Sequence, residues 1–258
     1  MKLRSSVMNE DMISSAELSR AACCNLGESF VTNPSVDVSY SDAATGAKQI
    51  KLLGLSGTYV QMLTENIPNY RGAAAPYGLG YVPGPWMQSI QVSKGTSSVK
   101  NGYEAITGQI NVEFKKPQLP EADWVSANLF ASTTNRYEAN ADATLKLSKR
   151  WSTSLLAHYE NETKAHDGND DGFVDIPQVE QYNVWNRWAY MGDHYVFQAG
   201  IKALSETRTS GQANHGGTMH SGDLYKVGID TERYEFFTKN AYIFNKEKNT
   251  NLALILST

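Results

Sequence analysis

The sequence contains little cysteine and no long apolar run, and each scarcity excludes a class of protein. Only 2 cysteines occur among 258 residues, and because Cys23 and Cys24 are adjacent they cannot form the spaced C-x-x-C pairs of zinc and redox sites. A vicinal disulfide and two separate thiols both stay open, and we assign them no chemistry. No stretch of about 18 apolar residues occurs, so no membrane-spanning helix is predicted.

An excess of either charge is also missing. The net charge is only -4, and no basic, aromatic-rich cluster indicates nucleic acid as a partner. No Ser-His-Asp order, phosphate-binding loop or H-E-x-x-H motif is present, so the chain is not predicted to be an enzyme. Of the scattered histidines, His215 and His220 share a glycine-rich loop, for which ligand or metal contact and simple exposure both stay open.

A secretory signal cannot be recognised at the start of the chain. Lys2 and Arg4 could begin one, but polar residues between positions 5 and 11 occupy the place of the apolar core that a signal needs. For an envelope protein we therefore expect the start of the natural chain to lie upstream of Met1.

Tyrosine and tryptophan are abundant, with 14 and 5 residues, although the mean hydropathy is low at -0.44. Membrane β-barrels use these side chains in interfacial girdles. A tyrosine-rich soluble sheet protein would have the same composition, so both classes stay open at this point.

Residues 83–117 separate two regions with different sequence patterns. The segments SIQV (89–92) and QINVEF (109–114) alternate as strands do, with Gly95, Gly102 and Gly108 between them. Before this joint, residues 12–33 have helical spacing and a capping signal at Ser14 or Ser15 with Glu17, and residues 36–40 and 49–53 alternate as strands. We predict a compact helix-and-strand domain over residues 7–117.

Downstream, the sequence pattern of residues 123–258 predicts long strands. Residues 137–147 alternate apolar and polar side chains over about eleven positions, the length of a tilted strand that crosses a bilayer. Seven strands are predicted in all: 124–132, 137–147, 151–160, 181–191, 195–207, 233–244 and 251–258. Their connections at 148–150, 192–194 and 245–250 are short, whereas 164–180 and 210–232 are long, and short turns alternating with long loops are typical of outer-membrane barrels.

Two motifs resemble the plug domain of TonB-dependent outer-membrane receptors. The first is the strand ending at Lys94-Gly95, the run Asn101-Gly102-Tyr103-Glu104-Ala105-Ile106, Gly108, and the strand that closes at Lys116-Pro117. The second is the pair of segments 48–54 and 60–68, in which Leu53 stands where the family often has arginine and Glu65-Asn66 where it often has aspartate-glycine. The resemblance covers the chain from about Ile13 onward.

The resemblance implies an α+β plug followed by antiparallel transmembrane strands, about 7 of the roughly 22 in a plugged transporter. It implies an outer-membrane receptor that takes up a siderophore, heme, cobalamin or another scarce ligand with energy from TonB. The TonB-contacting box is not found before Met12. The loop 70–85 then corresponds to a plug loop facing ligand, with Arg71, Tyr77 and Tyr81 as candidate contacts, although a purely structural loop stays open.

Residues 167–175 match the start of a calcium-binding loop. Asp167, Asn169 and Asp171 place side-chain oxygens at positions one, three and five, Phe173 would offer a backbone carbonyl, and Asp175 a carboxylate at position nine. Gln178 at position twelve and the flanking strands exclude an EF-hand. Asp, Asn and Gly also dominate ordinary turns, so a solvated acidic loop without metal is the alternative interpretation of residues 167–175. For the whole chain, the alternative to a membrane receptor is a soluble calcium-stabilised β-sheet binding protein or adhesin.

Overall fold

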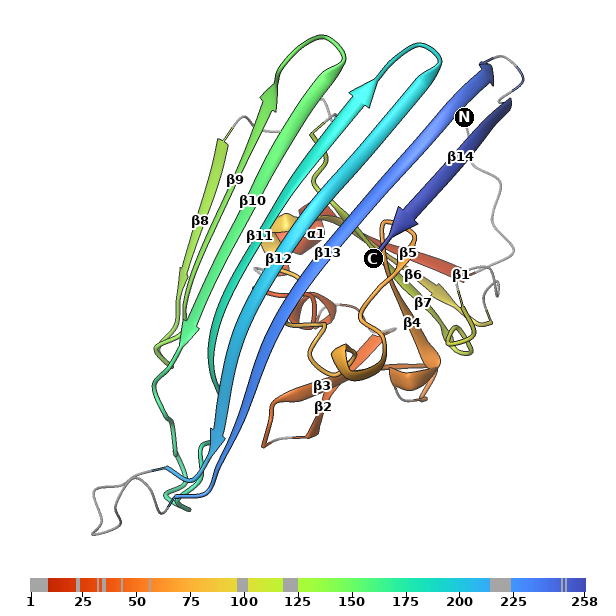
Figure 1. The fold of residues 1–258 in the computed structure, drawn as a ribbon. Coiled ribbons are helices and arrows are strands. Elements are labelled where there is room, and N and C mark those ends of the chain that lie inside the picture. Colours follow the sequence, from red (N-terminus) through yellow and green to blue (C-terminus); the bar gives the residue numbers. More distant parts are fainter. Residues whose placement is uncertain are drawn as a thin grey trace. The chain divides into compact units, whose positions relative to one another are not determined.

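The computed structural model describes residues 9–21, 24–31, 33, 36–42, 44–55, 57–96, 102–117, 125–213, 224–246, 248 and 250–258. Among these residues no helix is long and apolar enough to cross a membrane. The chain divides into two compact units, residues 1–114 and 115–258 (Figure 1). The domain bounds 7–117 and 123–258 stay predictions, and each unit is described by itself below.

The first unit is a small mixed sheet with one helix, as its described residues show. Five strands hydrogen-bond in the order β1-β6-β7-β4-β5, with β4 and β7 parallel and the other pairs antiparallel. A separate hairpin joins β2 to β3. The elements are β1 (Asn9–Ser14), α1 (Ser15–Ala21), β2 (Val36–Asp42), β3 (Ala47–Leu52), β4 (Val60–Thr64), β5 (Ile67–Pro68), β6 (Met87–Lys94) and β7 (Gly108–Phe114), with 3-10 turns η1 (Glu28–Phe30), η2 (Gly57–Tyr59), η3 (Gly72–Ala74) and η4 (Gly84–Trp86).

The start of this unit differs from the sequence prediction. Within the expected helical stretch at 12–33, the described residues form α1 over Ser15–Ala21 and the 3-10 turn η1 over Glu28–Phe30. At the start of α1, Glu17 accepts hydrogen bonds from the backbone N–H and hydroxyl of Ser14 at 2.7 and 2.9 Å. The capping signal was therefore confirmed. Met12 and Ile13 instead belong to β1, because Ile13 pairs with Ile90 of β6 and is 6% exposed. Pairing with a strand far along the chain overrides the local helical spacing.

The turn between β4 and β5 replaces aspartate-glycine with Glu65-Asn66. Both residues have positive φ, 50° and 65°, which is the left-handed conformation of a two-residue hairpin turn that usually needs glycine or asparagine. Hydrogen bonds hold it: Glu65 N donates to Val112 O at 2.9 Å, and Asn66 N donates to Asn111 Oδ1 at 2.8 Å. Contacts with β7 thus stabilise a turn that the sequence alone disfavours.

The second unit is one curved antiparallel sheet, and its described residues form seven strands in the order β14-β13-β12-β11-β10-β9-β8, so that each strand pairs with its neighbours in sequence. This confirms the predicted antiparallel strands, and the barrel is not closed within this chain. The strands are β8 (Val125–Ala131), β9 (Tyr137–Lys146), β10 (Trp151–Glu162), β11 (Gln178–Met191), β12 (Tyr195–Gly211), β13 (Lys226–Asn245) and β14 (Thr250–Ser257).

Several strands are longer than predicted at the end that leads into the long loops. The structure begins β13 at Lys226 rather than 233, and extends β12 to Gly211, with Lys226 opposite Gly211. The expected pattern of apolar outward and polar inward residues is reversed there, since Val227 and Ile229 point inward and Asp230 and Glu232 outward. The backbone pairing continues nonetheless, so the second long connection is shorter than the predicted 210–232.

Gly108 is the glycine on which the sheet of the first unit depends most. A Cβ at this position would lie 2.1 Å from Ser93 O of the paired strand β6 and 2.6 Å from a Leu52 side-chain carbon, at a φ of 153°. We expect Gly108→Ala to destabilise the first unit by about 3 kcal/mol, because overpacking against backbone forces the strands apart. Faster amide hydrogen exchange in β6 and β7 would be the measured result.

Gly228→Ala is the matched control, since a Cβ there meets nothing within 4 Å. It should leave exchange in β6 and β7 unchanged. Equal exchange in native chain and Gly108→Ala would contradict this account of the packing.

Candidate functional site

The two faces of the seven-stranded sheet have opposite polarity. On the inner face, alternate side chains of β9 to β12 are polar yet buried, including Glu138, Asn183, Arg187, Lys202 and Glu206, which are all 3% exposed or less. On the outer face, apolar side chains are exposed, including Leu155 at 47%, Ile201 at 63% and Leu254 at 56%. A water-soluble sheet would show the reverse arrangement.

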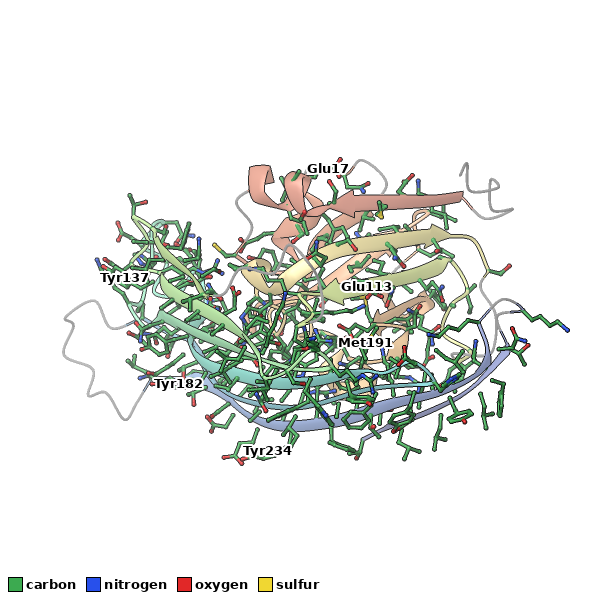
Figure 2. The ribbon with its side chains drawn as sticks, turned by 90° about the horizontal axis from the view of Figure 1, so that it is seen from above. Glu17, Glu113, Tyr137, Tyr182, Met191 and Tyr234 are labelled. Carbon is green, nitrogen blue, oxygen red and sulfur yellow. The ribbon has the colours of Figure 1, made fainter. Side chains whose placement is uncertain are left out.

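Aromatic side chains divide the outer face into bands. On β10, β11 and β13, two outward aromatic residues are separated by eight positions in each strand: Trp151 and Tyr159, Tyr182 and Tyr190, Tyr234 and Tyr242. Trp151 lies opposite Tyr190, and Tyr159 opposite Tyr182, with ring centroids 5.1 and 4.9 Å apart. Figure 2 shows Tyr182 and Tyr234 projecting from the same side of the sheet.

The spacing of these bands matches a bilayer. Eight residues span about 27 Å along a strand at about 3.4 Å per residue. A strand tilt of about 40° reduces this to about 21 Å, near the roughly 25 Å apolar band of outer-membrane barrels. Between the bands, the register of β9 to β13 places no Asp, Glu, Lys or Arg on the outer face. The acidic outward residues Glu180, Asp230 and Glu232 lie beyond them.

Ion pairs connect the charged residues of the inner face. Arg136 contacts Glu138 at 2.6 Å and Glu160 at 3.1 Å, and the Glu138 side chain is only 1% exposed. On the next strands Arg208 contacts Glu206 at 3.1 Å, and Gln181 Nε2 donates to the other oxygen of Glu206 at 2.8 Å. The charged residues of the inner face are therefore paired with residues of opposite charge, and we call this ion-paired surface the charged wall. The sequence alternation predicted its polarity but not its pairing.

The ligand contacts predicted in the first unit are not brought together. Arg71 is exposed and its Nε donates to Glu104 Oε1 at 2.7 Å, with the guanidinium 5.9 Å from the Tyr103 ring centre. Tyr77 is half-buried. Tyr81 is 1% exposed and its ring packs against Tyr70 with centroids 6.3 Å apart. The structure thus places Arg71 and Tyr77 at or near the surface and Tyr81 in the core.

A pocket of about 210 Å³ lies beside this loop, and no sequence motif predicted it. Its walls come from the β2–β3 hairpin, η2, β4 and the segment 70–79, with buried Ile50, Tyr70 and Leu79 below and Lys48 and Thr58 among the polar lining residues. At the hairpin turn, the Thr45 hydroxyl donates to Asp42 Oδ2 at 2.6 Å and thereby lowers the pKa of the exposed Asp42 carboxyl.

The acidic loop 167–175 is an ordered turn in which carboxylates accept backbone hydrogen bonds. Asp167 accepts from the N–H groups of Asp171 and Gly172 at 3.2 and 2.7 Å, and Asp175 accepts from Gly168 N at 2.7 Å. Phe173 forms a bridge with Gln212, which fixes the loop against the end of β12.

The fit of this loop to calcium is partial. Three oxygen-bearing side chains lie close together: Asp167 and Asn169 both accept from Asp171 N, at 3.2 and 3.3 Å, and Asn169 Nδ2 donates to Asp171 Oδ2 at 2.9 Å. No group of three or more His, Cys, Asp or Glu residues in the described chain has a metal-ligand arrangement. His215 and His220 lie outside the described residues. Calcium binding therefore stays a prediction.

We predict that calcium binds this loop with a dissociation constant of about 0.1–1 mM, the range of extracellular calcium modules. Calorimetric titration of the chain in detergent micelles would measure it. Asp171→Asn should weaken binding about tenfold, because a hard cation loses one formal charge among its ligands. The exposed Asp230→Asn is the control and should bind as the native chain does. Absence of binding heat from the native chain would remove the calcium hypothesis.

Arg136 offers a test of the charged wall. In Arg136→Ala, the nearly buried carboxylates of Glu138 and Glu160 lose their shared cation, so the free energy of unfolding should fall by about 3–5 kcal/mol. Arg150→Ala removes the same side chain from an ion pair with Asp193 whose members are 55% and 67% exposed, and should cost at most about 1 kcal/mol. Unfolding in micelles, followed by circular dichroism, measures both. An equal fall in the free energy of unfolding in both variants would show that burial does not determine how much these ion pairs stabilise the protein.

Comparison with known proteins gives the family of the first unit. Residues 2–109 match the family model "TonB-dependent Receptor Plug Domain". No curated protein matches the sequence. The chain therefore carries a TonB-dependent receptor plug domain followed by strands with the fold of these receptors, as the sequence motifs predicted.

Three solved receptors illustrate the similarity of fold. The chain matches the ferripyoverdine receptor of the outer membrane of Pseudomonas aeruginosa with a TM-score of 0.75 and 14% identity, over 100% of this chain and 34% of that one. It matches the alcaligin outer-membrane receptor FauA of Bordetella pertussis with 0.71 and 12%, over 98% and 39%. It matches the siderophore receptor PirA of Acinetobacter baumannii with 0.70 and 17%, over 96% and 39%. The chain thus spans little more than a third of the length of these receptors.

Proposed function

We propose that the chain forms the plug, residues 7–117, and the first barrel strands, residues 123–258, of an outer-membrane receptor that takes up a scarce ligand with energy supplied through TonB. The observation that carries the proposal is the outer face of the sheet. Two aromatic bands enclose a surface without Asp, Glu, Lys or Arg, and such a surface suits lipid rather than water.

Similar solved structures support the proposed ligand class. The receptors quoted above are described as receptors of ferripyoverdine, alcaligin and siderophores, so we propose a siderophore or another metal chelate such as heme or cobalamin. In this chain Arg71 and Tyr77 are the proposed ligand contacts, since they lie at or near the surface of the plug loop. The core position of Tyr81 removes it from this set. No catalytic activity is proposed.

Fractionation of cells that express the complete gene tests the proposal. The protein should sediment with outer membranes, resist extraction by high salt and carbonate, and dissolve only in detergent, because a lipid-facing apolar surface is not released by ionic conditions. A protein recovered without detergent would contradict the proposal. It would favour the alternative, a soluble calcium-stabilised β-sheet binding protein or adhesin, which the exposed apolar face of the sheet does not support.

A further inference from the structure

The tight turns at one edge of the second unit carry an excess of positive charge. They connect β9 to β10 at 147–150, β11 to β12 at 192–194, and β13 to β14 after Asn245, and the strand ends that they join lie along the upper edge in Figure 1. Their described charged residues are four cations, Lys149, Arg150, Lys246 and Lys248, and one acid, Asp193. We name the four cations the basic turn edge. Glu247 lies outside the described residues.

The opposite edge has the opposite charge. In its described connections and adjoining strand ends, residues 132–136, 163–180, 212–213 and 224–226, five acids outnumber three cations: Asp167, Asp170, Asp171, Asp175 and Glu180 against Arg136, Lys164 and Lys226. The excess of lysine and arginine is therefore a property of one edge and not of the sheet as a whole.

The basic turn edge lies directly beside one aromatic band. Arg150 precedes Trp151, and Lys246 follows Phe244 by two residues, while Tyr195 follows Asp193 by two. Since aromatic bands mark the boundary between the apolar core and the polar headgroups of a membrane, the cations lie at headgroup level.

Hydrogen bonds fix the spacing of the turns. Met191 N donates to Arg150 O at 2.8 Å and Ile243 N donates to His194 O at 2.8 Å, which joins each turn to the next. Asp193 contacts Arg150 at 2.9 Å and Lys246 at 3.6 Å, so one acid lies between two cations. Turns two strands apart are separated by about 10 Å. The cations are thus held in a row rather than on mobile segments.

We propose that the basic turn edge binds the headgroups of anionic phospholipids in the leaflet that contacts this end of the strands. The proposal rests on the proposed function, because it requires the outer face to contact lipid. Its chemistry is the attraction of Lys and Arg near a membrane surface to negatively charged headgroups, which strengthens binding by about fivefold for each cation at low salt.

The test measures lipid selectivity of the whole chain in dodecyl maltoside micelles. Energy transfer from tryptophan to dansyl-labelled phosphatidylglycerol is compared with transfer to dansyl-labelled phosphatidylcholine, since Trp151 and Trp188 are exposed on the outer face at this end. We expect the anionic lipid to bind at least about tenfold more tightly. The preference should vanish in 1 M salt, where the Debye length falls to about 3 Å.

Two double variants separate position from net charge. Lys149→Gln with Lys246→Gln removes two cations from the basic turn edge and should reduce the preference by at least about fivefold. Lys164→Gln with Lys226→Gln removes two exposed cations from the opposite edge and should leave it unchanged. All four lysines are exposed, so stability should change by less than about 0.5 kcal/mol in each variant.

Three outcomes would overturn the proposal. Equal binding of both lipids by the native chain would remove it while leaving the lipid-facing surface intact. Equal loss in the two double variants would show that only net charge matters. Binding of neither lipid would contradict the proposed function as well, because the outer face would then not contact lipid.

Discussion

The alternation of side chains along paired strands is the constraint on which the second unit depends. Because successive residues point to opposite faces, a shift of register by one residue would move every side chain of a strand to the other face. In β10 and β11 such a shift would place Glu160 and His158 among exposed apolar side chains and bury Tyr159. The cost of the misplaced charges therefore enforces one register, and the tight turns that hydrogen-bond to one another maintain it.

The same constraint explains which parts of the fold could be predicted from the sequence. Where the outer face is apolar and the inner face polar, as in β9 and β10, alternation located the strands to within a residue or two. It failed at 226–232 because the polarity of the two faces reverses beyond the aromatic band: Val227 and Ile229 lie on the inner face, and Asp230 and Glu232 on the outer face. It failed at Met12 and Ile13 because β1 is a strand only through its pairing with β6.

The candidate site was less predictable than the fold. A glycine-rich segment with three tyrosines indicates a loop, but its sequence does not determine which rings turn inward. Tyr70 and Tyr81 are buried, at 4% and 1% exposed, whereas Tyr77 is half-buried. The pocket beside that loop is lined by four segments between Ser41 and Leu79, so no local sequence motif predicts it. The acidic loop could be located from the sequence because its turn chemistry is local. Its carboxylates accept hydrogen bonds from backbone N–H groups of the same loop.

The charged wall on the inner face has no explanation in stability alone. Removing a charged pair from water costs several kcal/mol per ion, and well-packed apolar residues of similar volume would often stabilise a fold as well or better. Yet Arg136, Glu138 and Glu160 form such a cluster, and Lys202 with Glu235 another. An apolar inner face would also remove the difference between the two sides of the sheet that fixes the register. The wall therefore distinguishes the inner face of the sheet from the outer face, although an apolar inner face would often be as stable or more so.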